Sequence, residues 1–162
     1  MDLRLIINGK KAADEQLRDA IGQFRTRQPL AVRVTYEGGD IERFINEAVT
    51  EGVKRVVVAG GNGTVNEAVN ALMKLEKSQR LGLAILPVGT ANDFATAANI
   101  PHGYLPALKL AAQGQSHAID TVEVDKRYFV NVASAGFGAK ITATTPPALK
   151  NLLGGGAYTL AG

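Results

Sequence analysis

Glycines and small polar residues cluster at Gly60–Asn66, in the sequence GGNGTVN. The apolar run Val56–Ala59 precedes this cluster, and apolar residues then recur at i, i+3, i+4 and i+7, the spacing of one helix face: Val65, Ala68, Val69 and Leu72. Glycine lets a ligand approach the backbone closely. The unpaired N–H groups at the start of a helix carry partial positive charge and favour phosphate. The stretch therefore predicts a strand, a glycine turn and a helix that together hold a phosphate group.

Two structural alternatives compete with this phosphate site. Asn62-Gly63 is typical of a hairpin turn, but the helical spacing that follows opposes that interpretation. A purely structural turn stays open. We expect Thr64 to cap the helix, with Glu67 as its partner in a capping box. We also expect a positive φ at Gly63, where an added side chain would be strained and would block the ligand.

A second loop of the same kind follows the next apolar run, in the sequence LPVGTANDFATAANIP at 86–101. Pro87 and Gly89 end the strand, and small polar residues cluster where a helix would begin: Thr90, Asn92 and Asp93. These residues could be helix caps alone. Since both loops follow buried strands, we expect them at the same carboxyl edge of a sheet, where open α/β sheets bind ligands.

The spacing weighs against two common phosphate-binding motifs. A P-loop requires Gly-Lys-Ser/Thr, and the sequence contains no such run. A dinucleotide fingerprint requires a third glycine, where this chain has Asn66, and an acidic residue at the ribose position, which is missing. An NAD-dependent oxidoreductase is therefore a weaker alternative.

Alternating strands and helices predict an α/β fold, with crossover helices on both faces of a mostly parallel sheet in three layers. The four predicted strands are Leu3–Ile7, Leu30–Val34, Val56–Ala59 and Leu83–Leu86. Helical spacing lies between them, at Leu17, Ile21 and Phe24 and at Ile41–Val49. His117–Val124 and Arg127–Val132 predict an antiparallel hairpin that turns at Asp125-Lys126.

The composition excludes several classes of protein. The 162 residues include no cysteine, which excludes disulfides and thiolate metal sites. A net charge of +3 with no basic arm argues against nucleic-acid binding. The apolar run near the N-terminus is too short to cross a membrane, so we expect a cytoplasmic protein without a transmembrane segment. His102 and His117 stand apart, with no partner pattern.

Three blocks together resemble the catalytic domain of the diacylglycerol kinase family, in its bacterial lipid kinase branch. They are GGNGTVNEAVNAL with LGLAILPVGTANDFA, the opening LIINGKKA, and AIDTVEVDKRYFVNVASAGFGAKI. The resemblance implies an N-terminal ATP-binding α/β domain similar to NAD kinases and phosphofructokinases, here residues 1–145. It also implies that residues 146–162 are a linker to a missing C-terminal β-rich domain, and we expect self-association through this apolar end.

By the same resemblance, the protein transfers the γ-phosphoryl group of ATP, with Mg²⁺, to a lipid hydroxyl at a membrane surface. The lipid would be diacylglycerol- or phosphatidylglycerol-like. The nucleotide-binding residues implied by the motifs are Thr35, Gly61, Asn62, Gly63, Thr64, Val65, Asn66, Glu67 and Thr90. Asn8 and Lys10 would add phosphate contacts, and Asp120 matches an acidic position important to activity.

The sequence departs from the family pattern at Asn62, where the family motif Gly-Gly-Asp-Gly-Thr has an aspartate. The neutral amide lacks the charge that would act on a Mg²⁺-bound nucleotide. The resemblance also implies that the general base and much of the metal site lie in the C-terminal domain. We therefore assign no catalytic base and no metal ligand here, and expect this chain alone to be inactive. A non-catalytic nucleotide-binding or regulatory module remains the main alternative.

Overall fold

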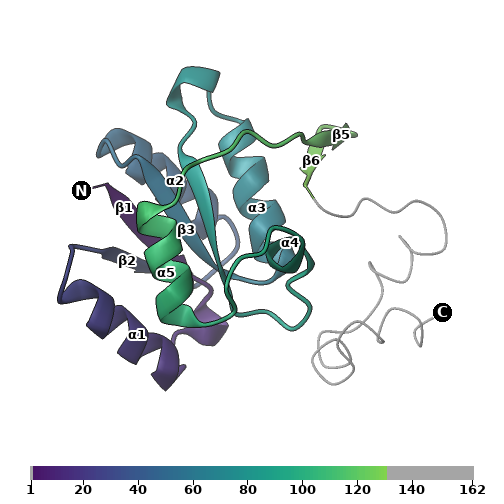
Figure 1. Cartoon of the computed structure of the whole chain (residues 1–162). Helices are drawn as coiled ribbons and strands as arrows, with labels where there is room; N and C mark the ends of the chain where they lie inside the picture. Colours follow the sequence, from purple (N-terminus) through teal and green to yellow (C-terminus); the bar gives the residue numbers. More distant parts are fainter. Residues whose placement is uncertain (1, 131–162) are drawn as a thin grey trace.

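A computed structural model describes residues 2–130, with a parallel sheet at the centre (Figure 1). Four strands form this sheet in the order β2-β1-β3-β4, and every neighbouring pair is parallel. Their bounds are β1 (Leu3–Ile7), β2 (Ala31–Val34), β3 (Arg55–Gly60) and β4 (Gly82–Pro87). The predicted α/β fold is confirmed, and each predicted strand lies within two residues of its observed position.

Helices cover both faces of the sheet in two pairs (Figure 1). α1 (Glu15–Arg25) packs with α5 (Tyr104–Gln113), while α2 (Asp40–Thr50) packs with α3 (Asn62–Met73). The shorter helices are η1 (Gly9–Lys11), η2 (Lys77–Gln79) and α4 (Asp93–Ala97).

Alternate residues of the strands enter two separate hydrophobic clusters. In β3, Val56 and Val58 pack with α2 and α3, and Val57 packs with α1 and α5. This is the period-two alternation of a strand that is buried on both faces. The result is the predicted three-layer arrangement of helices, sheet and helices.

The charged side chain of Arg4 lies inside this core. Arg4 of β1 is fully buried, and its guanidinium donates to the Phe44 carbonyl oxygen at 3.3 Å and to the Glu51 carboxylate. Both partners belong to the α2 region, with Glu51 at the C-cap of the helix. A buried charge is tolerated when it is paired and hydrogen-bonded, so Arg4 connects α2 to the sheet.

The predicted hairpin is confirmed in shorter form. β5 (Val122–Val124) and β6 (Arg127–Phe129) are antiparallel, and Asp125 and Lys126 both adopt positive φ between them. The first strand begins at Val122 and not at His117, because residues 117–121 are not in a strand. In the register that pairs Val122 with Phe129, the positions opposite residues 117–120 lie outside the described residues.

Some predictions fall outside the described residues. These include the end of the second hairpin strand, the linker at 146–162 and its apolar side chains.

Breaking the Arg4–Glu51 pair should destabilise the fold. Glu51→Gln leaves the buried guanidinium without its anionic partner, and we expect a loss of about 1–3 kcal/mol in the free energy of unfolding. Adding Arg4→Met should recover much of that loss, since an apolar side chain of similar length leaves no buried charge. Urea denaturation of the single and double variants measures both effects. A double variant that is less stable than Glu51→Gln would contradict this account of Arg4.

Candidate functional site

The turns that follow the four strands form one continuous edge, which we call the carboxyl edge. Backbone hydrogen bonds link neighbouring turns: the Asn8 N–H donates to the Ala59 oxygen at 3.1 Å, and the Val88 N–H donates to the Gly60 oxygen at 3.3 Å. The Gly9 N–H donates to Thr35 Oγ1 at 3.1 Å. The two glycine loops therefore lie side by side, as the sequence predicts.

The glycine loops pack backbone against backbone. A Cβ added to Gly89 would lie 2.4 Å from the Gly61 Cα, and one added to Gly61 would lie 3.1 Å from the Gly89 Cα. Gly60 is equally crowded, because a Cβ there would lie 2.3 Å from Thr64 Oγ1. Since the first of these contacts leaves no room for a side chain at position 89, glycine is required there by close approach.

Helix α3 begins within the first loop, with Gly61 as its N-cap and no side-chain capping bond. The prediction that Thr64 caps this helix was wrong: α3 starts two residues before Thr64, which is buried inside its first turn. An N-cap glycine has no side chain that could accept from the first N–H groups. The first backbone N–H groups of α3 therefore lie at the carboxyl edge with no side chain capping them.

The expected positive φ at Gly63 was also wrong. Gly63 is the second residue of α3 and does not have a positive φ. A Cβ added there would meet no atom within 4 Å. The carboxyl edge is therefore open in front of Gly63, and a small side chain at this position would extend into that space.

The second loop is closed by Asn92, which sequence reasoning had treated as a helix cap. Its side chain bonds back to Gly89, accepting from the N–H at 2.9 Å and donating to the oxygen at 2.7 Å. Asn92 adopts φ 53° and makes no capping bond to α4. The carboxamide thus replaces a backbone partner for Gly89 and sets the shape of the loop. Thr90 lies exposed on this loop.

A side-chain hydrogen bond joins the two loops. Asn62 Nδ2 donates to Asp93 Oδ2 at 2.7 Å. Asn62 is the first residue of α3 and Asp93 is the first residue of α4. The amide that departs from the family motif therefore contacts a carboxylate directly, where an aspartate would bring two like charges together.

The turn after β2 is held by a residue that sequence reasoning missed. The Asp40 carboxylate accepts from the N–H groups of Tyr36 at 2.7 Å and Glu37 at 3.1 Å, and from Arg43 Nη2 at 2.6 Å. These bonds, chiefly those from the backbone of Tyr36 and from Arg43, lower the pKa of Asp40 to about 2. The sequence signal that could have revealed this role is an aspartate placed three and four residues after the two loop residues whose N–H groups it accepts.

The other residues that the sequence predicts as nucleotide contacts lie partly at the carboxyl edge and partly within α3. Asn8 Oδ1 accepts from the Lys10 N–H at 3.1 Å and so caps η1 at the carboxyl edge. Glu67 lies in α3, where burial raises the pKa of its carboxyl group despite a hydrogen bond from the Gly39 backbone. Asn66 Oδ1 is buried without a hydrogen-bond partner among the described residues. Val65 is buried and packs in the core.

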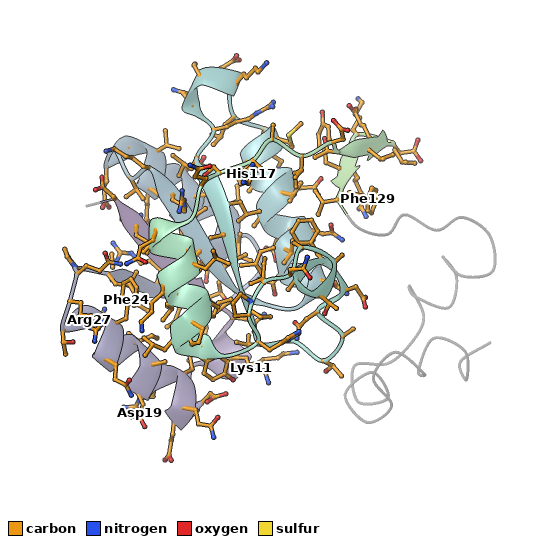
Figure 2. All side chains as sticks on the ribbon, viewed as in Figure 1. Lys11, Asp19, Phe24, Arg27, His117 and Phe129 are labelled. Carbon is orange, nitrogen blue, oxygen red and sulfur yellow. The ribbon has the colours of Figure 1, made fainter. Side chains whose placement is uncertain are left out.

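Asp120 lies apart from the hydrogen bonds that connect the carboxyl edge. It is exposed and follows a segment at the opposite edge, where Arg55 donates to Ser116 Oγ at 3.0 Å. Figure 2 shows Lys11 and His117 at opposite ends of the sheet. The structure thus brings the glycine loops, Asn8, Thr35 and Thr90 to one edge, and Asp120 is not joined to them by a described contact.

The donor set at the carboxyl edge suits a phosphate better than a bare metal ion. Among residues 2–130, no group of three or more His, Cys, Asp or Glu could hold a metal. The Asp93 carboxylate lies at the two glycine loops, and its Oδ2 accepts a hydrogen bond from Asn62. Mg²⁺ is often held by one or two carboxylates together with substrate phosphates, so the residues fit a Mg²⁺ that arrives on a nucleotide.

The family model of the diacylglycerol kinase catalytic domain matches residues 2–124. The chain belongs to this family. It is 49% identical over 162 residues to a protein of Shewanella frigidimarina named "Probable lipid kinase YegS-like", and 48% identical over 160 residues to one of the same name from Yersinia enterocolitica. The chain spans about half the length of these relatives, 52% and 54%.

Solved structures carry the same fold as this kinase-family chain. A crystal structure described as a diacylglycerol kinase from Bacillus anthracis is 30% identical, with a TM-score of 0.67 over 79% of this chain and 49% of its own. A second chain from that organism reaches a TM-score of 0.71 at 28% identity, over 90% of this chain and 52% of its own. In residues 2–130, none of the helices has the length and apolar character needed to span a bilayer.

Two glycines of the site should respond differently to substitution by alanine. Gly89→Ala forces the loops apart and should cost about 1–3 kcal/mol of unfolding free energy, as overpacking does. The methyl group added by Gly63→Ala would extend into open space, and alanine favours a helix more than glycine does. This substitution should therefore be neutral or stabilising by up to about 1 kcal/mol. Urea denaturation compares the pair directly. Equal effects of the two substitutions would contradict the backbone contact between Gly61 and Gly89.

The Asp40 bonds predict a pH-dependent stability. Because the folded-state pKa lies near 2, below the ordinary 3.8, the stabilisation is complete above that ordinary value and is lost as the pH falls toward 2. Asp40→Asn should therefore be less stable than the wild type at pH 7, and the gap should close in acid. Denaturation midpoints at several pH values measure this gap, with exposed Asp19→Asn as control. A stability difference between wild type and Asp40→Asn that stays constant as the pH falls would contradict a stabilising role for the ionised Asp40 carboxylate.

Proposed function

We propose that this chain is the nucleotide-binding domain of an ATP-dependent lipid kinase. In the longer protein, the γ-phosphoryl group of ATP would pass to the hydroxyl group of a diacylglycerol- or phosphatidylglycerol-like lipid at a membrane surface. The relatives named as lipid kinases support the reaction class. One observation carries the binding role: the start of α3 lies in the first glycine loop, has no side-chain cap, and packs closely against the second glycine loop.

The chemistry of the carboxyl edge supports this role in three ways. The N–H groups at the start of α3 are donors with partial positive charge, which suits phosphate oxygens. The open space in front of Gly63 gives a phosphate access to the backbone. Thr35, Thr90 and Asn8 lie on neighbouring turns of the same edge and would add polar contacts. Mg²⁺ would supply charge neutralisation on the transferred phosphoryl group when bound with ATP.

The non-catalytic alternative is favoured by one specific observation. Asn62 places a neutral amide against Asp93 where the family motif has an aspartate. Phosphoryl transfer depends on positioning and charge stabilisation, so the missing carboxylate would lower the rate. Asn62→Asp in the longer protein separates the two functions. A kinase should gain activity from this substitution, whereas a binding module should gain none.

ATP binding should depend on the space in front of Gly63. Gly63→Val fills this space with a branched side chain, and we expect at least about a tenfold loss of ATP affinity with the fold intact. Thr64→Val is the matched control. Its side chain is buried against Gly60, so replacing the hydroxyl group by a methyl group should change affinity less.

Calorimetric titration with ATP and Mg²⁺, together with circular dichroism, measures affinity and folding in the same samples. Unchanged ATP affinity in Gly63→Val would overturn the phosphate site. A wild-type chain that prefers NAD to ATP would overturn the kinase proposal.

A further inference from the structure

Tyr36 presents an aromatic ring to solvent from a turn that is held in place. Its side chain is 98% exposed. The turn itself is anchored on both sides, because the Thr35 N–H donates to the Ile7 oxygen at 2.9 Å and the Tyr36 N–H donates to Asp40 Oδ2 at 2.7 Å. The exposure therefore belongs to an ordered backbone, and the ring has no packing role inside the described part of the chain.

The strand order sets the place of Tyr36 along the carboxyl edge. Tyr36 follows β2, Lys10 and Lys11 follow β1, and the Gly61–Gly63 turn follows β3, and these strands are successive neighbours in the sheet. Neighbouring strands lie about 4.8 Å apart, so the Tyr36 turn and the glycine turn are separated by about 10 Å along the edge. An aromatic ring, two ammonium groups and a set of helix N–H donors thus occur in that order.

This order matches the chemistry of a nucleotide laid along the edge. Phosphates suit the N–H donors and ammonium groups, and a nucleobase at the other end needs a flat apolar surface. We propose that Tyr36 is the stacking surface for the nucleobase, an assignment that rests on the proposed nucleotide-binding function. The following glycines leave room for the base, since a Cβ added to Gly38 or Gly39 would meet no atom within 4 Å.

A membrane contact is the competing role for an exposed aromatic residue in a lipid kinase family. The charges nearby do not decide between the two roles, because an anionic bilayer would repel the carboxylate of Glu37 and attract Lys10 and Lys11. Nearby Val34 is 45% exposed and adds only a small apolar area beside the ring. A base that stacks on one ring face needs no larger apolar patch than this.

Two ligands that share a triphosphate group, one of them without a nucleoside, test the assignment on the 162-residue chain. Calorimetry would give dissociation constants for Mg²⁺-ATP and for Mg²⁺-tripolyphosphate, which has no base. Tyr36→Leu should weaken ATP binding by about tenfold, the range expected for one stacked base, and leave tripolyphosphate binding unchanged. Tyr36→Trp should keep the ATP affinity. Leu110→Ala removes an exposed apolar side chain from α5 and should change neither constant.

Each other outcome overturns the assignment in a recognisable way. A wild-type chain that binds neither ligand would remove the proposed function and this inference with it. Wild-type binding of ATP with no change in Tyr36→Leu would remove the inference alone. Equal weakening of both ligands would show that Tyr36 acts on the shape of the turn. Loss of sedimentation with phosphatidylglycerol vesicles in Tyr36→Leu, with ATP affinity unchanged, would assign the ring to a membrane.

Discussion

The close approach of the Gly61 and Gly89 backbones is the contact on which the carboxyl edge depends. It brings the turn after β3 against the turn after β4, at a separation that excludes a side chain on Gly89. With this contact in place, α3 and α4 begin side by side, and Asn62 reaches Asp93. A wider separation would move the start of α3 away from the second loop. The arrangement of helix donors and polar side chains therefore follows from two residues that have no side chain.

Asparagine side chains then fix the turns around this contact. Asn8 accepts from the N–H of Lys10, and Asn92 pairs with both the N–H and the oxygen of Gly89. Asn70 does the same for the hairpin, accepting from the Tyr128 N–H at 2.9 Å and donating to its oxygen at 2.8 Å. A carboxamide carries one donor and one acceptor group, so it can replace a backbone peptide where no strand is available. The two loops are thereby closed, and the hairpin is held to α3, without extra strands.

Two ionic groups attach α2 to the sheet at its two ends. Asp40, at the first turn, binds the loop after β2, where a carboxylate is also favoured by the helix dipole. Glu51, at the last turn, binds the buried guanidinium of Arg4 in β1. The helix thus links the carboxyl edge to the interior of the sheet. The same loop that Asp40 holds carries Thr35, so the position of a predicted nucleotide contact depends on α2.

The sequence alone determined the fold class, the four strands and the placement of both glycine loops at one edge, because buried parallel strands and helix faces leave periodic apolar patterns that are local. It also identified the family through motifs that are contiguous in the chain. The start of α3 and the backbone angles at Gly63 were predicted wrongly, since the N-cap depends on how Gly61 packs against a loop about thirty residues away. The roles of Asp40 and Asn92, the burial of Arg4 and the bond between Asn62 and Asp93 were decided only by tertiary structure. Each is a specific polar contact, and no periodic pattern in the sequence records which groups will pair.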